Sequence, residues 1–254
     1  MQLIFLGTGT STGVPSIGCR CAACTSMDVR DRRLRASALL QVDGRNLLID
    51  CGPDFRQQIL RMDSPELSAL LVTHYHYDHV GGVDDLRPYC AGREEGFPIY
   101  CRKEVADTLR RTVPYGFADE RYPGAPVFAI HQVDNATFSV DGIEVTPLPV
   151  MHNKLPIIGF RVGRLAYITD AKTISDTTMR LLQGVDTLVV NALRVKEHFS
   201  HFNLKEALDV VERVSPRVAY FTHMSHDMGP HAEASRRLPA GVNLAYDGLT
   251  VTIP

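Results

Sequence analysis

The most constraining feature of this 254-residue chain is the run LVTHYHYDH, in which four metal-binding side chains fall within six residues. These side chains are His74, His76, Asp78 and His79. The apolar segment LSALLV (67–72) precedes them and is typical of a short buried strand, and a Gly81-Gly82 turn signal follows. The sequence therefore predicts a cluster of metal donors at the end of a strand.

An extended backbone through this run would place alternate side chains on the same face. His74, His76 and Asp78 would then converge, while His79, on the turn, would face a second ion. Imidazole and carboxylate donors together suit zinc, manganese or iron. The alternative is a solvated, histidine-rich loop, since a short motif needs structural context before it identifies a site.

Length and composition indicate one globular domain spanning residues 1–254. The apolar fraction of 44% and the charged fraction of 22% are ordinary for a protein with a sizeable core. The 27 basic and 29 acidic residues leave a net charge of -2, so there is no strong nucleic-acid signal and no bulk attraction to an anionic membrane. A phosphate-bearing substrate would have to be bound locally.

The N-terminal segment MQLIFLGTGT has no basic region and too short an apolar stretch for a signal peptide or a membrane span. We therefore expect a cytoplasmic protein without membrane partners. The oligomeric state is not readable from the sequence, and a homodimer stays open.

Three of the six cysteines form a tight C-x-C-x-x-C cluster at Cys19, Cys21 and Cys24. A tetrahedral structural zinc site needs a fourth ligand, and three thiolates with one histidine are a familiar set. Small buried thiols or a flexible surface loop are the alternatives. The other three stand among apolar or strand-like neighbours and are expected to fill the core: Cys51, Cys90 and Cys101.

Hydrophobic periodicity and turn signals predict many strands interspersed with helices. Helices are expected at 54–62, 83–90, 103–113, 175–185 and 203–214. Strands are expected at 2–9, 36–44, 45–52, 67–72, 98–102, 127–133, 136–140, 143–150, 158–163, 165–170, 186–192, 218–224, 243–248 and 249–253. This order fits an α/β fold with two sheets and helices outside them.

Three further donors lie just past apolar strands: His152 after TPLPV, Asp170 after LAYIT and His223 after VAYFT. Strand ends commonly carry functional residues. Taken singly, each of these residues is more often a capping or hydrogen-bonded side chain than a ligand. Together with the histidine-rich run, they indicate one metal centre.

With these residues in order, the chain resembles the metallo-β-lactamase superfamily, whose H-x-H-x-D-H motif matches THYHYDH. The resemblance implies a four-layer αββα sandwich of two mixed β-sheets flanked by helices, with a dinuclear site along one edge. It assigns His74, His76 and His152 to the first metal, Asp78, His79 and His223 to the second, and Asp170 to a bridging position. It also implies that Asp50 supports the ligands from behind by orienting an imidazole.

The chain further resembles the phosphoribosyl cyclic phosphate phosphodiesterase subgroup, through G-C-x-C-x-x-C, the residues around His226 and the closing AYDG. In that subgroup three cysteines and a histidine bind a structural zinc, here Cys19, Cys21, Cys24 and His226. His201 matches a histidine proposed to contact substrate and protonate the leaving group. His198 offers a competing position three residues earlier, and a general acid requires geometry that the sequence does not supply.

The expected activity is that of a metal-dependent phosphoric diester hydrolase with two catalytic Mn or Zn ions and one structural Zn. Two ions about 3.5–4 Å apart can hold a bridging hydroxide that opens a small, nucleotide-like or cyclic phosphodiester such as 5-phosphoribosyl 1,2-cyclic phosphate. Asp78 would help to orient this hydroxide, and His201 would donate the proton to the leaving oxygen. The alternatives are an RNA-processing nuclease, a thioester hydrolase, or a non-catalytic metal-binding protein.

Overall fold

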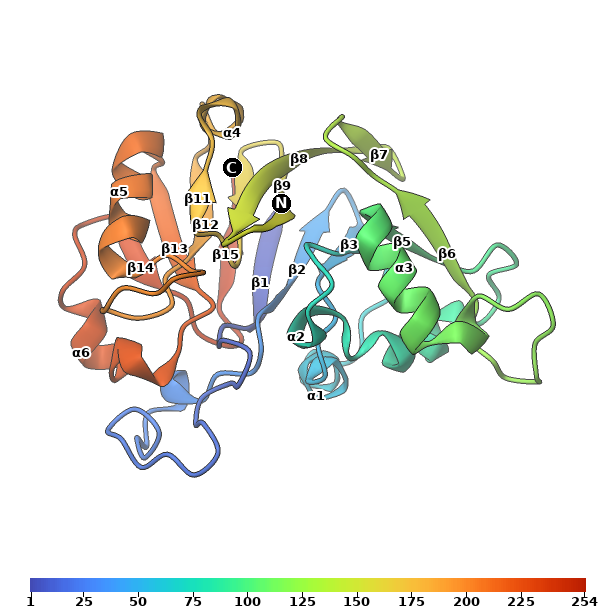
Figure 1. The fold of residues 1–254 in the computed structure, drawn as a ribbon, viewed down its shortest axis with the longest axis horizontal. Coiled ribbons are helices and arrows are strands. Elements are labelled where there is room, and N and C mark those ends of the chain that lie inside the picture. The colour runs from blue at the N-terminus through green and yellow to red at the C-terminus, as the bar shows by residue number, and fades with distance from the viewer.

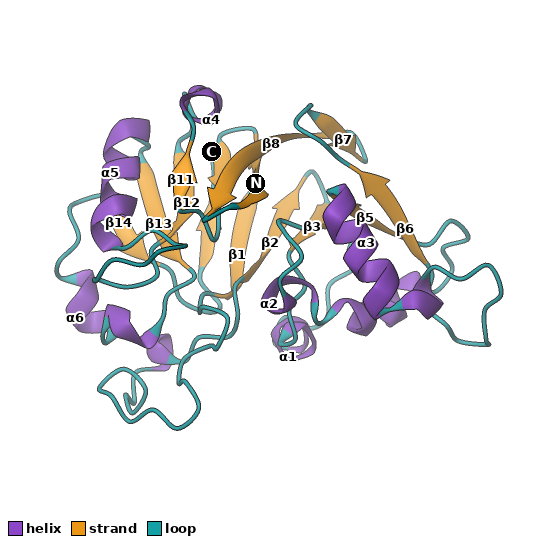
Figure 2. Ribbon diagram, viewed as in Figure 1, coloured by secondary structure: helices purple, strands orange, loops and turns teal.

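The computed structural model describes residues 1–254 and contains two mixed β-sheets packed face to face (Figures 1 and 2). The first sheet has the order β15-β1-β2-β3-β4-β5-β6, antiparallel from β15 to β3 and parallel from β3 to β6. Its strands are β1 (Gln2–Gly7), β2 (Ser37–Val42), β3 (Arg45–Ile49), β4 (Ala69–Leu71), β5 (Phe97–Cys101), β6 (Phe128–Gln132) and β15 (Thr250–Thr252).

The second sheet repeats this division, with antiparallel pairing on one side and parallel pairing on the other. Its order is β11-β8-β9-β10-β12-β13-β14, with β7 paired to β8, and the strands from β10 to β14 are parallel. The strands are β7 (Phe138–Val140), β8 (Ile143–His152), β9 (Leu155–Val162), β10 (Leu165–Tyr167), β11 (Thr173–Ile174), β12 (Thr187–Asn191), β13 (Val218–Thr222) and β14 (Val242–Leu244).

Helices cover the outer face of each sheet, as Figure 2 shows. The helices beside the first sheet are α1 (Phe55–Leu60), α2 (Tyr77–Val80) and α3 (Lys103–Thr112), and those beside the second are α4 (Asp176–Leu181), α5 (Leu204–Val214) and α6 (His231–Ser235). Short 3₁₀ helices are η1 (Val29–Asp31), η2 (Val83–Cys90), η3 (Pro114–Gly116) and η4 (His226–Met228). The predicted αββα fold class is confirmed.

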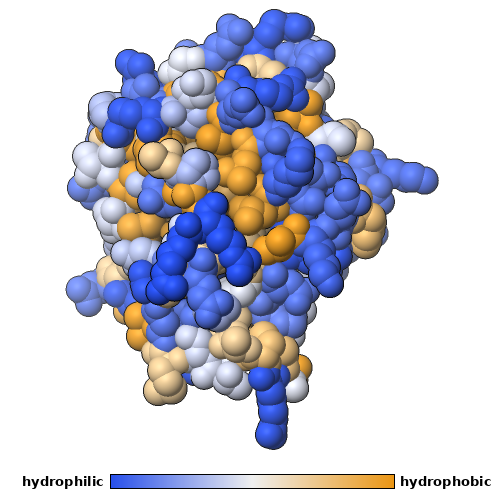
Figure 3. Space-filling model, turned by 90° about the vertical axis from the view of Figure 1, so that its left-hand side faces the viewer, coloured by the Kyte–Doolittle hydropathy of each residue, from blue (hydrophilic) through white to orange (hydrophobic).

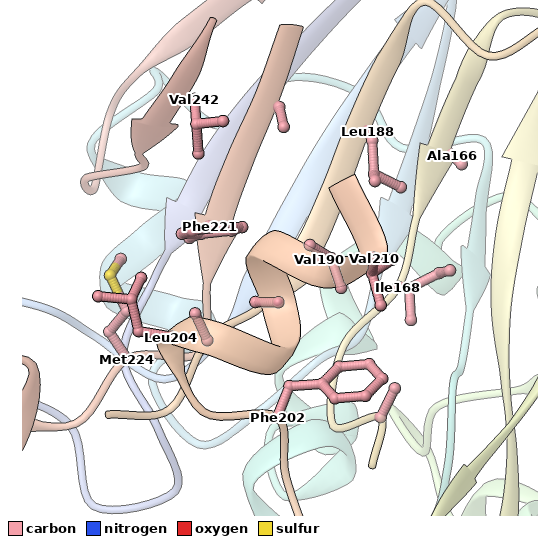
Figure 4. Packing of buried hydrophobic residues seen from close by; sticks show 14 of the residues in the cluster. Ala166, Ile168, Leu188, Val190, Phe202, Leu204, Val210, Phe221, Met224 and Val242 are labelled. Atoms are coloured by element: carbon pink, nitrogen blue, oxygen red, sulfur yellow. The ribbon is translucent and has the colours of Figure 1, made fainter. Parts of the chain in front are cut away.

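Three apolar layers follow from this arrangement. One lies between the two sheets and includes Phe160 and Tyr167, and another lies between the first sheet and its helices. The third lies between α5 and the second sheet and includes Val210, Leu188 and Phe221 (Figure 4). On the face of the molecule that carries α5 and α6, patches of hydrophobic residues are exposed among hydrophilic residues (Figure 3).

Two local expectations require correction. The backbone does not stay extended to Asp78, because α2 begins at Tyr77 with His76 as its N-cap. Asp78 therefore does not share a face with His74 and His76 by strand alternation. The segment 83–90 forms a 3₁₀ helix rather than an α-helix, and Pro88 within it lacks the N–H that an α-helical turn would use.

The parallel strands of both sheets bring their carboxyl ends to one edge of the sandwich. In the first sheet β3 pairs in parallel with β4, and in the second β10 pairs in parallel with β12 and β12 with β13. In open α/β sheets this is the edge where ligands bind. The candidate residues follow these strands, so the topology itself gathers them.

Hydrogen bonds of the buried Arg33 and the partly buried Asp247 join the segment between β1 and β2 to the C-terminal part of the chain. Arg33 donates to Ala245 O at 2.6 Å, and Asp247 accepts from Leu34 N at 2.7 Å and from Thr8 Oγ1 at 2.8 Å. Burial raises the pKa of Asp247 from 3.8 to about 6, although its hydrogen bonds and Arg33 oppose the change. The charged form of Asp247 is therefore less favourable in the folded protein than in the unfolded chain.

We expect Asp247 to make the protein less stable as the pH rises from about 4 to above about 6. Its folded pKa lies above its unfolded pKa, so its contribution is fully present below about pH 4 and lost through pH 6, by on the order of 3 kcal/mol. The measurement is the free energy of unfolding of the unaltered protein minus that of Asp247→Asn at each pH. A difference that stays constant over this range would contradict the prediction.

No helix has the length and apolar character needed to cross a membrane; the longest, α5, has 11 residues.

Candidate metal centre

The edge where the parallel strands end holds a dense cluster of histidines and carboxylates. Asp50 follows β3, and the run from His74 to His79 leads from β4 into α2. From the second sheet come the last residue of β8 and residues just beyond β10 and β13: His152, Asp170 and His223. All seven predicted ligands are buried except His76, which is half-buried.

Four of these residues converge around one point. His79 Nε2 lies 3.2 Å from both Asp78 Oδ2 and Asp170 Oδ2. His223 Nε2 lies 3.2 Å from Asp170 Oδ1 and 3.5 Å from Asp78 Oδ2. Their donor atoms all lie within 4.8 Å of one another, which is close enough for one ion to contact all four. The structure thus brings together the predicted second-metal set.

The predicted first-metal histidines lie next to this group. The ring centroids are 4.6 Å apart for His74 and His76, 5.1 Å for His76 and His152, and 5.8 Å for His74 and His152. The His74 and His79 rings are 4.2 Å apart, so the two groups are contiguous. His152 lies more than 70 positions after the other histidines in the sequence, and the ends of β4 and β8 meet at one edge of the sandwich, which brings it into contact with them.

Asp50 and Thr73 form a polar layer behind the histidines. Asp50 accepts from His79 Nδ1 at 2.7 Å, from Thr73 N at 2.8 Å and from Thr73 Oγ1 at 2.9 Å. His74 Nδ1 lies 3.0 Å from Thr73 Oγ1, and because that hydroxyl donates to Asp50, His74 is the donor in this pair. The geometry agrees with the orienting role expected of Asp50, which stays a prediction.

The hydrogen bonds assign the ring tautomers and show that the cluster fits metal ions. His74, His79 and His152 each donate from Nδ1, the last to Ser200 O at 2.8 Å. The Nε2 atoms of His74 and His79 are buried without a hydrogen-bond partner, and His79 Nε2 faces carboxylate oxygens of Asp78 and Asp170 at 3.2 Å. His223 has no hydrogen-bond partner at either nitrogen, although its Nε2 faces Asp170 Oδ1 at 3.2 Å. Burying a ring nitrogen without a hydrogen-bond partner costs free energy unless a cation or a water molecule contacts it.

The electrostatics favour positive charge in this cluster. Burial opposes charge on His79, but the surrounding carboxylates outweigh it and raise its pKa. Burial likewise opposes ionisation of Asp170, yet His223 and His79 hold its pKa well below the usual range. Burial lowers the pKa of His74, which therefore stays neutral. A cation bound among these carboxylates would displace the proton from His79, since a histidine ligand must be neutral.

The backbone is strained where several of these residues lie. Asp50, Asp170 and His223 have φ angles of 60°, 58° and 56°, in the left-handed region that non-glycine residues seldom adopt. In addition, a Cβ added at Gly52 would lie 2.1 Å from Asp78 O, so α2 approaches this turn too closely for any side chain. Strain of this kind persists where the surrounding structure demands a particular side-chain direction.

His201 lies against the cluster, and His198 lies behind it. His201 Nε2 is 2.9 Å from Asp170 Oδ1, and its Nδ1 is 3.0 Å from Ser200 Oγ and 3.2 Å from His198 Nδ1. His201, His152 and Asp170 also form a set with donor atoms within 4.8 Å of one another. Between the two candidates for a proton donor, only His201 touches a residue of the cluster.

A second cluster joins Cys19, Cys21, Cys24 and His226 within 4.8 Å of one another. His226 Nδ1 lies 3.4 Å from the sulfurs of both Cys19 and Cys21. Hydrogen bonding, first from the backbone of Cys24 and then from His226, lowers the pKa of Cys21 to about 6 although burial opposes it. The cluster therefore offers a thiolate and an imidazole, as structural zinc requires.

Two residues that position members of the cluster were not predicted from the sequence. The Asn191 side chain accepts from Ala171 N at 2.8 Å and donates to Ala171 O at 2.9 Å, which fixes the residue after Asp170. Ser200 supplies the carbonyl that orients His152. Asn191 could have been found, because it is a polar residue at the end of the apolar run TLVVN. Ser200 could not, because it acts through its backbone carbonyl, which every residue has.

Comparison with known proteins identifies the family. A family model described as a β-lactamase superfamily domain matches residues 45–224. The crystal structure of a new diphosphatase from the PhnP family superposes with a TM-score of 0.92 at 41% identity, covering 100% of this chain and 98% of that one. Zn(2+)-bound PqqB from Methylobacterium extorquens has a TM-score of 0.83 at 21% identity, with both chains fully covered, which supports the fold alone.

A curated relative, an octanoyltransferase from Porphyromonas gingivalis, is 41% identical over 256 residues. The match covers 100% of this chain but 52% of that protein, so the chain spans about half the length of this relative. The name octanoyltransferase therefore refers to a protein about twice as long as this chain. From the family model, the diphosphatase match and the αββα sandwich, the chain belongs to the metallo-β-lactamase superfamily and to its PhnP family.

Proposed function

We propose that this chain is a metal-dependent phosphodiesterase that opens a small cyclic phosphodiester such as 5-phosphoribosyl 1,2-cyclic phosphate. The observation that carries the proposal is the convergence of ionised Asp78 and Asp170 on the buried rings of His79 and His223, whose Nε2 atoms face these carboxylates at 3.2 Å without forming a hydrogen bond. The 41% identity to a PhnP-family diphosphatase over almost its whole length supports chemistry at phosphorus.

The ligand sets proposed for the two ions follow the two groups of donors. One ion would be held by His74, His76 and His152, the other by Asp78, His79 and His223, and Asp170 would be shared. Zinc or manganese suits this nitrogen and oxygen set. Two divalent ions in such a set supply Lewis acidity and charge neutralisation at the phosphoryl group and lower the pKa of water.

The remaining chemistry belongs to the side chains. Asp78 orients the attacking water, while Asp50 holds His79 in the tautomer that leaves Nε2 free. His201 donates the proton to the departing sugar oxygen. Burial lowers the pKa of His201 to about 4, with its hydrogen bond to Asp170 opposing. The negative charge of a bound phosphodiester would oppose this lowering of the pKa, whereas the proposed metal ions would add to it.

The cluster of Cys19, Cys21, Cys24 and His226 is proposed as a closed structural zinc site. Its four side chains leave no position for a substrate, as is usual for such sites. Because His226 lies only three residues after His223, this site would tie the N-terminal loop to the catalytic cluster.

The proposal is tested by metal analysis together with hydrolysis of bis(p-nitrophenyl) phosphate and 5-phosphoribosyl 1,2-cyclic phosphate. About three metals per chain and turnover of both substrates are expected, because the chain offers two catalytic positions and one structural position. Parallel assays with an octanoyl thioester and a transfer-RNA precursor examine the thioester-hydrolase and nuclease alternatives. Full metal loading without turnover of any phosphodiester would overturn the proposal and favour a non-catalytic metal-binding protein.

Replacing His201 by asparagine is expected to lower kcat for the cyclic phosphodiester by about 100-fold, because the leaving sugar oxygen loses its proton donor. The loss should shrink for bis(p-nitrophenyl) phosphate, whose nitrophenolate leaves without protonation. His198→Asn tests the competing candidate and should change kcat less than His201→Asn does, since His198 contacts His201 but not Asp170. His131→Asn is the control and should change kcat by less than about threefold, because His131 is exposed on β6 and stacks on Tyr100. Equal losses on both substrates would instead make His201 a ligand or a structural residue.

A further inference from the structure

The loop between β12 and α5 carries an exposed aromatic ring close to the proposed catalytic cluster. Phe199 is 73% exposed and lies two residues before His201, whose Nε2 is 2.9 Å from Asp170 Oδ1. The Phe199 ring belongs to none of the three apolar layers of the fold. Nothing in the proposed function uses this ring, although it lies on the same loop as the proposed proton donor.

This loop is braced, so the exposed ring is presented from a defined backbone. Leu193 N donates to Phe202 O at 2.9 Å, and Leu204 N donates to Arg194 O at 2.8 Å, which closes the loop at its base. Within the loop, Arg194 Nη2 donates to Glu197 O at 2.7 Å. A group held in this way binds a ligand at a smaller cost in entropy than a mobile segment does.

A row of ring contacts joins Phe199 to the proposed metal ligands. The ring centroids are 4.6 Å apart for Phe199 and His198, 5.1 Å for His198 and His201, and 4.5 Å for His201 and His152. Ser200 N donates to His198 Nδ1 at 3.3 Å, which orients the ring next to Phe199. Phe199 is therefore the outer end of a continuous row whose inner end is a proposed ligand of the first metal.

The place of His201 in this row indicates which part of a substrate would meet Phe199. In the proposed function His201 donates a proton to the departing sugar oxygen, so the sugar lies on the His201 side of the cleaved phosphodiester. One imidazole, that of His198, separates the His201 ring from the Phe199 ring. In a nucleotide, likewise, one sugar ring separates the phosphate from the base. A base on the sugar would therefore reach the Phe199 side of the loop.

The exposed phenyl ring offers such a base a face on which to stack. Removing apolar surface from water stabilises a complex, and aromatic side chains contribute large areas of it. Stacking on an aromatic side chain is a common way to hold bases, and it tolerates every base because each has a π-face. The side chain of Phe199 has no hydrogen-bond donor or acceptor, so it distinguishes a substrate with a base from one without a base.

We propose that Phe199 is a specificity-determining residue that stacks on an aromatic base carried by the sugar of the substrate. The inference rests on the proposed function and adds a preference to it: among small cyclic phosphodiesters, those with a base on the sugar bind more tightly than those without one. The preference concerns the group beyond the sugar, whereas the metal centre and His201 act on either kind of substrate.

The first test compares adenosine 2′,3′-cyclic phosphate with methyl riboside 2,3-cyclic phosphate, which has the same sugar and phosphodiester but no base. Phe199→Ala is expected to raise KM for the adenosine substrate by roughly 10-fold, as for the loss of one stacked base, and to change kcat/KM for the other substrate by less than about twofold. Phe199→Trp should keep the low KM, because an indole ring also stacks on a base. Tyr122→Ala is the control, since it removes another exposed aromatic side chain, from the segment before β6, and should leave both substrates unaffected.

Turnover of the methyl riboside substrate shows that a variant is folded and loaded with metal. If Phe199→Ala does not fold, Phe199→Leu keeps an apolar side chain without a π-face and should reproduce the selective rise in KM. A similar loss for both substrates would make Phe199 a structural residue, and no loss for either would leave it without a part in binding. Each of these two results would overturn the proposal.

Fluorescence gives a second test that is independent of turnover, because the sequence contains no tryptophan. Phe199→Trp places the only indole at the proposed stacking position, and adenosine 2′-monophosphate should quench its emission saturably, whereas ribose 5-phosphate should not. Tyr122→Trp places the only indole elsewhere and should be quenched by neither compound. Base-dependent quenching in a protein that hydrolyses no phosphodiester would keep the stacking site and reject the proposed function. Hydrolysis without quenching and without a base preference would reject the stacking site alone.

A second copy of the chain is the other group that could cover an exposed aromatic ring. Analytical ultracentrifugation of the unaltered protein and of Phe199→Ala separates this arrangement from base stacking. The same oligomeric state for both proteins is expected and supports the stacking site. A dimer that Phe199→Ala dissociates, with KM unchanged for both substrates, would assign the ring to an interface and overturn the proposal.

Discussion

Replacing Asp170 by asparagine is expected to lower kcat/KM for phosphodiesters by roughly 10³- to 10⁴-fold, because several kcal/mol of charge stabilisation at the phosphoryl group depend on this carboxylate. Asp170 Oδ2 lies 3.2 Å from His79 Nε2, and Oδ1 lies 3.2 Å from His223 Nε2 and 2.9 Å from His201 Nε2. In the Asp170→Asn variant a neutral amide replaces the carboxylate, so the three imidazoles no longer share a negatively charged neighbour.

Steady-state kinetics and metal content measured on the same preparation check this prediction. The variant should retain fewer than two catalytic metals per chain, since the shared carboxylate is lost. Asp176→Asn is the matched control, because Asp176 on α4 forms an exposed ion pair with Arg213 on α5 and is not a member of the cluster. An Asp170→Asn protein with full metal content and turnover within tenfold of the original would remove Asp170 from the proposed site.

Replacing Cys21 by serine is expected to remove one metal per chain and to lower the free energy of unfolding by several kcal/mol. Structural zinc contributes about 10–16 kcal/mol in isolated zinc-finger peptides. The loss should be smaller here, because Arg33 and Asp247 also fasten the segment between β1 and β2. Cys21 is the residue to change, because hydrogen bonding lowers its pKa to about 6 and so favours the thiolate that zinc binds.

Metal analysis, denaturant unfolding and limited proteolysis of the N-terminal loop measure this effect. The loop carries Ile17, Met27 and Val29 as exposed apolar residues, and release from the zinc should make it sensitive to protease. Cys90→Ala serves as the control for metal content, because Cys90 is buried in the apolar layer beside the first sheet and is not one of the four clustered ligands. If Cys21→Ser kept its metal content and its stability, the structural zinc site would be wrong.

The donor types, their order and most of the secondary structure could be predicted from local sequence signals. The hairpin at Asp43-Gly44 was readable because both residues adopt positive φ, at 48° and 74°, which this dipeptide tolerates. The start of α5 was readable because Asn203 and Glu206 form a capping box. These elements depend on contacts within a few residues.

The local geometry around Asp78 was less predictable. Strand alternation suggested that Asp78 would join His74 and His76, but α2 turns it toward His79, Asp170 and His223. The turn is imposed from outside the segment, by the close approach of Gly52 to Asp78 O and by the hydrogen bond from Cys51 N to His79 O at 2.7 Å. Such contacts join residues separated by more than 25 positions.

The sequence alone determined which chemistry the chain can hold: imidazoles, carboxylates and a cysteine cluster at strand ends, in an order that resembles one superfamily. The tertiary structure decided which donors meet, which ring nitrogen each histidine presents, and that His201 rather than His198 touches Asp170. The physical reason is that side-chain type is local, whereas the direction of each side chain depends on hydrogen bonds across two sheets, as from His79 to Asp50 and from His152 to Ser200.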